Sequence, residues 1–324
     1  MNGTPVSECT HCHICQEGCH FLKKYGIDIG DTDRLKELAY HCFLCGKCTE
    51  VCPIGIDGRA EVMRLRQERT DSGERSSIES TYSGLLREKK DYIFRNYSGA
   101  SAGSVFFPGC NFPSLFPKTA KTVSGLLLKE AGISTVYDCC GKPVGELGLT
   151  DYETSIFAGL EVRIQKYGIT ELVTACPNCL YYMKGRVSVP VVNIYRKLRE
   201  LGLGNPVDMD VVLFLPCPDR YAKEWVDDIR YFVKGDIRCI DDIQCCGLGG
   251  SAAVKEPEIA KGFTAELKEE FAGSLRTYCA SCAGRIRRNG YKDIRHILSD
   301  VLGMKESPDT MKSYVNRMMT KRRR

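Results

Sequence analysis

The stretch Cys139-Cys140-Gly141, which returns as Cys245-Cys246-Gly247, decides how the rest of this 324-residue chain is interpreted. Each adjacent pair has one cysteine upstream and a C-x-x-C motif downstream. The first copy comprises Cys110, Cys139, Cys140, Cys176 and Cys179, and the second comprises Cys217, Cys245, Cys246, Cys279 and Cys282. Each copy thus has more thiols than a tetrahedral zinc ion or one cubane cluster binds. The extra thiol in each copy indicates a metal cluster of another kind.

Apolar strand-like runs and helical stretches alternate around these cysteines in the same order in both copies. Strand–helix–strand–helix–strand units imply parallel sheets with right-handed crossovers. Ligand-bearing loops of such sheets gather at the carboxyl ends of the strands, where all ten thiols fall. We therefore predict an α/β protein with a duplicated Rossmann-like cysteine-rich domain, at 105–206 and 207–304.

A different cysteine spacing opens the chain, as Cys9-x-x-Cys12-x-x-Cys15-x-x-x-Cys19, and recurs from Cys42 to Cys52. This is the run of a two-cluster ferredoxin, in which the fourth cysteine of each run binds the other cluster. One cubane [4Fe-4S] cluster is therefore expected on Cys9, Cys12, Cys15 and Cys52, and a second on Cys42, Cys45, Cys48 and Cys19. The first run also fits the c-type haem motif C-x-x-C-H, but haem would leave Cys15 and Cys19 unexplained.

Helical stretches at 33–41 and 58–69 make residues 1–70 an N-terminal all-α region, a helical two-cluster ferredoxin domain. Serine- and glycine-rich ends then mark a linker with a helix at 71–104. The seven basic and two acidic residues of the tail, 305–324, account for the net charge of +5. A disordered, solvated end is the favoured interpretation of this tail.

Composition limits the setting of the protein. Nineteen cysteines behind a start with no export signal indicate a reducing compartment and metal-bound thiolates rather than disulfides. No window approaches the ~20 apolar residues of a membrane span, and the formally neutral body argues against nucleic-acid binding. We expect a cytoplasmic protein with no transmembrane segment of its own, for which any contact with a membrane would go through a partner or a surface patch.

Three smaller signals remain. Cys239 is left over from the motifs and is expected to be a buried thiol. Lys142, Lys184 and Arg287 follow cysteine motifs, where they either bind an anionic substrate or form a solvated face. The glycines of 247–252 fit the dinucleotide fingerprint G-x-G-x-x-A. Close approach of the backbone to a cluster explains them better, so we expect no flavin or nicotinamide.

The C, CCG and C-x-x-C pattern resembles the cysteine-rich domain family of heterodisulfide reductase. A ferredoxin module ahead of two such domains is similar to its D-type catalytic subunit, and to the iron–sulfur subunits of glycolate oxidase and anaerobic glycerol-3-phosphate dehydrogenase. The resemblance implies that each five-cysteine set holds a non-cubane [4Fe-4S] cluster. These two clusters would face each other around a substrate disulfide.

The implied function is reduction of a small-molecule heterodisulfide to thiols, with electrons supplied through the two cubanes by a flavoprotein or a membrane cytochrome b. The alternative is an electron-transfer subunit of a flavin-dependent dehydrogenase for glycolate, lactate or glycerol-3-phosphate, passing electrons toward quinone. A zinc-stabilised binding module would explain the C-x-x-C pairs, but neither the adjacent cysteines nor the ferredoxin spacing.

Overall fold

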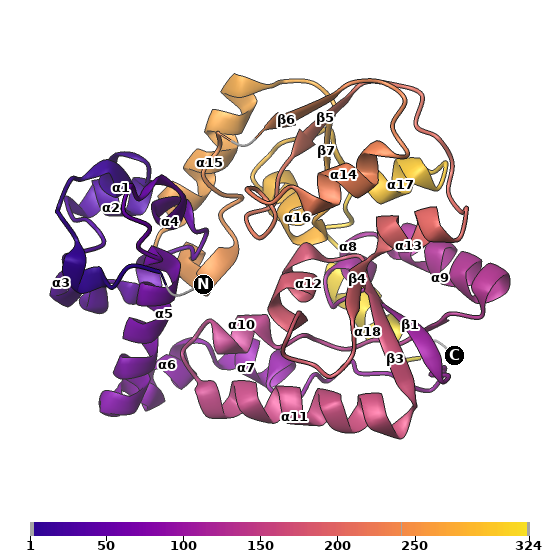
Figure 1. Cartoon of the computed structure of the whole chain (residues 1–324), viewed down its shortest axis with the longest axis horizontal. Helices are drawn as coiled ribbons and strands as arrows, with labels where there is room; N and C mark the ends of the chain where they lie inside the picture. Colours follow the sequence, from indigo (N-terminus) through magenta and orange to yellow (C-terminus); the bar gives the residue numbers. More distant parts are fainter. Residues whose placement is uncertain (1–2, 241, 323–324) are drawn as a thin grey trace.

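The computed structural model describes residues 3–240 and 242–322 and consists of a helical N-terminal region followed by two parallel sheets (Figure 1). The strand orders are β2-β1-β3-β4 and β6-β5-β7-β8. The predicted α/β class with an all-α N-terminal region is therefore confirmed. The helical region lies at the left of Figure 1, beside the α15 helix of the second sheet and above α6.

Short helices build the N-terminal region: η1 (Val6–Glu8), α1 (Ile14–Glu17), α2 (His20–Tyr25), α3 (Thr32–Glu37), η2 (Ala39–His41), α4 (Lys47–Val51) and α5 (Gly58–Arg69). Asp57 caps α5 by accepting a hydrogen bond from the Ala60 amide at 3.0 Å. Leu35 and Leu65 pack with Cys15 and Cys48 in one core cluster. The cysteine runs are thus part of the small apolar core of this region.

Residues 71–104, predicted as a linker with a helix, contain two helices that belong to the core. A π turn (η3, Thr70–Glu74) joins α5 to α6 (Arg75–Thr81), and α7 (Ser83–Lys89) follows. Tyr82 and Leu86 are buried in one cluster with Val105 of the first sheet. These helices therefore attach the N-terminal region to the first sheet.

The first sheet consists of β1 (Gly103–Phe107), β2 (Ser134–Thr135), β3 (Ile169–Thr174) and β4 (Val191–Asn193). Its helices are α8 (Phe112–Leu115), α9 (Pro117–Ala131), α10 (Lys142–Gly145), α11 (Thr150–Lys166), α12 (Pro177–Met183) and α13 (Ile194–Glu200). In register, Val105 of β1 lies between Ser134 of β2 and Leu172 of β3. Gly132 ends α9 with a φ of 65°, which glycine adopts without strain.

The second sheet repeats this order with β5 (Val211–Phe214), β6 (Ile237–Ile240), β7 (Leu275–Thr277) and β8 (Ile294–His296). Its helices are α14 (Glu224–Arg230), η4 (Gly249–Val254), α15 (Pro257–Glu270), α16 (Ala280–Arg288) and α17 (Ile297–Val301). The sequence predicts three strands in each half, whereas each half has a fourth, β4 or β8. Each of these strands has only three residues, which is too short for a periodic pattern to reveal.

The tail is folded, so the prediction of a disordered end is wrong for residues 305–322. Glu306 accepts hydrogen bonds from the backbone amides of Lys118 (3.0 Å) and Thr119 (2.7 Å) and thereby satisfies the first turn of α9. α18 (Ser313–Thr320) then packs on α8, and Asn316 donates to the carbonyl of Ser114 at 3.1 Å. Residues 323–324 of the predicted basic tail lie outside the described residues.

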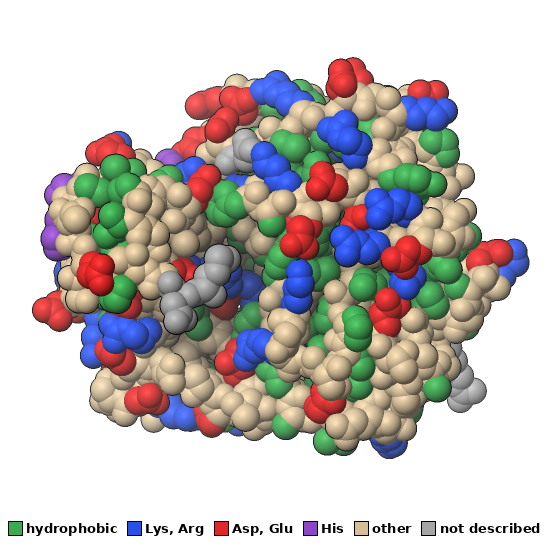
Figure 2. All heavy atoms as spheres, viewed as in Figure 1, with side chains coloured by type: hydrophobic (Ala, Val, Ile, Leu, Met, Phe, Trp, Pro, Cys, Tyr) green, Lys and Arg blue, Asp and Glu red, His purple; other side chains and the backbone are tan. Residues whose placement is uncertain are grey.

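The distribution of charged side chains on the surface agrees with the neutral net charge of the chain outside its basic tail. Figure 2 shows acidic and basic side chains interspersed over the visible face, without one dominant sign. Among the described helices, none combines the length and the apolar character that crossing a bilayer needs.

One arginine joins the three parts of the fold. Arg66 of α5 is fully buried, and its guanidinium donates to the carbonyls of Ala39 and Cys42 in the N-terminal region. It also donates to the carbonyls of Glu146, in the first half, at 2.5 Å and Gly250, in the second half, at 3.0 Å. Each of these carbonyls would lose a partner without the guanidinium.

We expect Arg66→Met to lower the free energy of unfolding by about 3 kcal/mol or more, because several carbonyls would be left buried and unsatisfied. Arg34→Met, on α3, is the matched control. Arg34 pairs with Glu37, and both side chains are more than half exposed, so its loss should cost less than about 1 kcal/mol. Anaerobic denaturant unfolding followed by the fluorescence of Trp225 measures both. Equal losses in the two variants would contradict the role of Arg66.

Candidate metal centres

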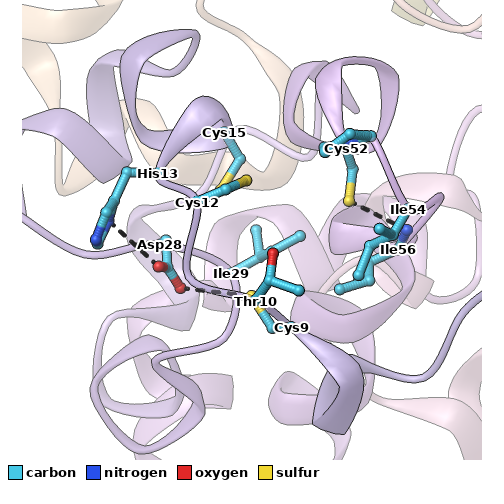
Figure 3. Close-up of a pocket in the computed structure, with 11 residues that line it drawn as sticks. Cys9, Thr10, Cys12, His13, Cys15, Asp28, Ile29, Cys52, Ile54 and Ile56 are labelled. Atoms are coloured by element: carbon cyan, nitrogen blue, oxygen red, sulfur yellow. Dashed lines mark hydrogen bonds and ion pairs between the residues drawn. The ribbon is translucent and has the colours of Figure 1, made fainter.

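The structure brings Cys9, Cys12, Cys15 and Cys52 to one small cavity (Figure 3). Three of these thiols come from the first ferredoxin run and the fourth comes from the second. A Cβ atom on Gly30 would lie 2.7 Å from the sulfur of Cys9, so glycine is needed where the chain passes this thiol. The amide of Ile56 donates to Cys52 Sγ at 3.3 Å.

Two histidines lie beside this first set. Nδ1 of His11 and Nδ1 of His13 lie 3.0 Å and 3.3 Å from Oδ2 of the buried Asp28. Oδ1 of Asp28 lies 3.9 Å from Cys9 Sγ. The histidines therefore contact the carboxylate of Asp28, which in turn lies beside Cys9 of the first set. Both imidazoles are more than half exposed.

Cys19, Cys42, Cys45 and Cys48 form the second set. Burial, together with the charges of Cys45 and Cys42, raises the pKa of Cys19. A Cβ atom on Gly58 would lie 2.6 Å from Cys48 Sγ, which again requires glycine beside a thiol. The structure thus brings the thiols of each crossed set near one another, and their binding of one cluster per set stays a prediction.

In the cysteine-rich halves, each motif lies just beyond the carboxyl end of a strand. Cys110 follows β1, and Cys176 is the N-cap of α12, which places Cys179 in the first helical turn. Gly109 has a φ of 76°, and a Cβ atom there would lie 2.9 Å from Cys179 Sγ. Gly141 has a φ of 83°, which explains the glycine after the first cysteine pair. The second half follows the same plan.

All thiols of the first set, and all of the second set except Cys217, lie within hydrogen-bonding reach of a neighbouring thiol of the same set. Hydrogen bonds from Cys139 and Cys179 lower the pKa of Cys140 to about 5. In the second half, hydrogen bonds from Cys245 and Cys282 lower the pKa of Cys246. Such a concentration of buried sulfur is stabilised by cations, and thiolates are the ligands that iron–sulfur clusters use.

The two sets face one cavity of about 240 Å³. Its walls include four cysteines from each half: Cys110, Cys140, Cys176, Cys179, Cys217, Cys245, Cys246 and Cys282. Cys139 and Cys279 complete the two sets and are buried. Phe43 and Leu44, from the second ferredoxin run, close one side of the cavity. The cavity therefore lies where all three parts of the chain meet.

Hydrogen bonds across the two halves fix their relative position. Nδ2 of Asn178, inside the first C-x-x-C, lies 3.6 Å from the sulfur of Cys279 in the second. Asn111, which follows Cys110, donates to the hydroxyl of Ser281 at 2.8 Å. These contacts hold the two sets facing each other across the cavity.

Of the predicted basic residues, only Lys142 lines the cavity, where its Nζ pairs with Oε1 of Glu146 at 2.5 Å. Lys184 is 58% exposed and lies 3.6 Å from Glu224. Arg287 donates to the carbonyl of Lys292. The structure thus brings neither Lys184 nor Arg287 to the cavity lining.

Two basic residues near the first set were missed by sequence reasoning. Lys89, at the end of α7, is buried in the cavity wall. Burial alone would lower its pKa, but the charges on Cys110 and Cys139 raise it overall. Arg317 of α18 has its pKa raised by Cys110 in the same way, against the effect of burial. Neither residue is near a cysteine motif in sequence, so no local signal could reveal them.

The structure also shows where Cys239 and the glycines of 247–252 lie. Cys239 lies in β6 opposite Leu213, outside the cavity lining, and it is half-buried rather than buried as predicted. A Cβ atom on Gly249 or Gly250 would overlap the backbone carbonyl of Phe43 or Cys42. These glycines therefore let the chain approach the backbone of the second ferredoxin run, whereas the prediction was approach to a cluster.

Comparison with known families gives two matches. Residues 5–56 match the 4Fe-4S dicluster domain. Residues 104–184 and 231–287 match the cysteine-rich domain family. The matched segments contain all eighteen cysteines of the four sets except Cys217, which precedes the second cysteine-rich segment.

Several curated proteins align with most of this chain. An uncharacterised iron–sulfur protein of Methanococcus maripaludis is 27% identical over 307 residues, covering 82% of this chain and 61% of the relative. The B-type subunit of the fumarate reductase (CoM/CoB) of Methanothermobacter marburgensis is 24% identical, covering 93% and 72%. The D-type subunit of the dihydromethanophenazine:CoB–CoM heterodisulfide reductase of Methanosarcina barkeri is 20% identical, covering 87% and 82%. The chain thus spans about three fifths of the length of the Methanococcus relative.

Substituting the glycine beside the first cysteine-rich set tests the arrangement. We expect Gly109→Ala to lose about four of about sixteen irons, because the added methyl would meet Cys179 Sγ. Gly125→Ala is the control, since a Cβ atom there has open space. Iron and sulfide analysis of anaerobically purified variants measures the loss. Full iron content in Gly109→Ala would show that the loop does not need glycine to seat the thiols.

Proposed function

Because the chain is an iron–sulfur protein that combines a 4Fe-4S dicluster domain with cysteine-rich domains like those of the D-type heterodisulfide reductase subunits, we propose that it reduces a disulfide to two thiols. The observation that carries the proposal is the shared cavity, which four thiols from each half line. Two clusters would fill part of this space, so it is the facing of the two thiol sets, rather than the volume of the cavity, that supports the proposal. A disulfide bound between the sets could place one sulfur at each of them.

The four thiol sets fit four clusters. Cys9, Cys12, Cys15 and Cys52 would hold one cubane, and Cys19, Cys42, Cys45 and Cys48 the other. The two five-cysteine sets would each hold a non-cubane [4Fe-4S] cluster on opposite walls of the cavity. Bound clusters supply single electrons, and disulfide cleavage needs two of them. The side chains that line the cavity then have to leave room for the substrate and balance the negative charge of the thiolates.

The overall reaction is disulfide plus two electrons plus two protons, giving two thiols. Lys142 and Lys89 place ammonium groups at the cavity wall, where each pairs with a carboxylate, of Glu146 and Glu88 respectively. Lys89 also lies near Cys110 and Cys139, whose negative charge it offsets in part. Lys142 is also the candidate for contact with an anionic substrate. The Asn111–Ser281 bond keeps the two walls at a fixed separation while the substrate is between them.

The two halves are inferred to be copies of one Rossmann-like unit. Both sheets have the same strand order, and both place the single cysteine, the pair and the C-x-x-C after corresponding strands. With the boundaries predicted above, a ferredoxin domain precedes these two copies. The source of electrons is a redox partner, for which a flavoprotein or a membrane cytochrome b is suitable.

The 4Fe-4S dicluster domain also supports a second candidate, because such clusters transfer single electrons. In this case the chain is an electron-transfer subunit of a flavin-dependent enzyme, passing electrons toward quinone. The four thiol sets would then form a relay, and no thiol would bind in the cavity. The two candidates differ in one observable property, which is whether the cysteine-rich sets respond to thiols.

We expect about sixteen irons per chain and a paramagnetic signal that appears when the oxidised protein meets a thiol substrate. The signal should be lost in Cys179→Ser and Cys282→Ser, whose side chains line the cavity from opposite halves. Cys239→Ser is the matched control, because Cys239 lies outside the cavity lining. Anaerobic iron and sulfide analysis with EPR, titrated with disulfides and thiols, makes the measurement.

Full iron content with no response to any thiol or disulfide would contradict disulfide reduction and favour the electron-transfer role. Far fewer irons, with one cysteine-rich set empty, would contradict the paired-cluster arrangement itself.

A further inference from the structure

Gln244 lies between the second ferredoxin set and the second cysteine-rich set. It directly precedes Cys245-Cys246, and its side chain reaches into the N-terminal region. Nε2 donates to the sulfurs of Cys19 at 3.2 Å and Cys45 at 3.4 Å. The side chain is 4% exposed, so these bonds are protected from water.

The other end of the amide is also used. Oε1 of Gln244 accepts a hydrogen bond from the backbone amide of His20 at 2.9 Å. This bond fixes which end of the amide is the acceptor and directs both N–H groups at the thiols. The orientation of the side chain is therefore determined by the protein.

A buried guanidinium supports the same junction. Arg220, which is 2% exposed, donates to the carbonyl of Gln244 at 2.5 Å. Burial lowers its pKa, but the charges of Cys217, Cys245 and Cys45 raise it overall. Its Nε atom has no hydrogen-bond partner among the described residues. A positive charge with an unused donor thus lies near thiols of both sets.

The first half has a different arrangement at the corresponding position. Asp138 precedes Cys139-Cys140, and its buried carboxylate pairs with Arg95 and Arg163, each at 3.1 Å. It makes no bond to a ferredoxin thiol among those that the structure describes. The amide link to the N-terminal region therefore belongs to the second half.

We propose that Gln244 is a positioning residue that raises the reduction potential of the centre on Cys19, Cys42, Cys45 and Cys48 and couples this centre to the second half. The inference rests on the proposed cluster assignment. Hydrogen bonds to cluster sulfurs stabilise the reduced, more negative state, so two N–H donors shift the potential upward. Gln244 itself gains and loses no electron, proton or bond when the centre takes up one electron.

The test is a redox titration of the full-length, iron-loaded chain, followed by EPR. Gln244→Glu keeps an oxygen for the His20 amide but replaces the donors with a negative charge. We expect its equilibrium constant for reduction at one centre to fall tenfold or more, which is about 59 mV for one electron. Gln244→Met removes the donors without adding charge and should shift the potential in the same direction by less.

Gln165→Glu is the matched control, because it makes the same change on the exposed face of α11, where Gln165 bonds Glu161. Its potentials should equal those of the wild type. Unchanged potentials in Gln244→Glu and Gln244→Met would overturn the proposal. Loss of about four irons from both variants would also overturn it, because Gln244 would then serve assembly rather than potential. The titration needs no disulfide, so an absent thiol response would refute the proposed function and leave this result intact.

Discussion

The guanidinium of Arg66 is the interaction on which the arrangement of the three parts depends. Its donors join backbone carbonyls of the ferredoxin region, the first half and the second half at one buried point. Two of these carbonyls, at Glu146 and Gly250, follow the two Cys-Cys-Gly turns by a few residues. One side chain therefore sets the distance between the second ferredoxin run and both cysteine-rich sets. A guanidinium whose partners are backbone carbonyls suits this task, because these carbonyls cannot move away without unfolding the turns that contain them.

The shared cavity depends on the presence of both cysteine-rich halves. A single cysteine-rich unit would expose its thiols at the end of one sheet. Two units place their strand ends toward each other, and Asn178 and Asn111 tie one set to the other. The halves nevertheless differ in their surroundings. Lys89 and Arg317 adjoin the first set, whereas Gln244 and Arg220 join the second set to the ferredoxin region. The two halves thus contain equivalent sets of thiols, but different residues surround each set.

The sequence predicted what depends on local spacing. The crossed grouping of Cys19 with Cys42 to Cys48 and of Cys52 with Cys9 to Cys15, and the thiols at strand ends, follow from motif rules. It did not predict the folded tail, because Glu306 finds its partners about 190 residues upstream, at the start of α9. It also did not predict that Gly249 and Gly250 contact the backbone of Cys42 and Phe43. Such contacts join segments that carry no motif for each other, so only the assembled fold reveals them.

Disulfide cleavage between the two halves requires two iron–sulfur centres that face one cavity. Diffraction at the iron absorption edge, from crystals of the intact chain grown anaerobically, would locate them. We expect four compact groups of iron sites, two of them on opposite walls of the cavity between Cys179 and Cys282. Iron confined to the ferredoxin region, or to only one of the two halves, would contradict this expectation.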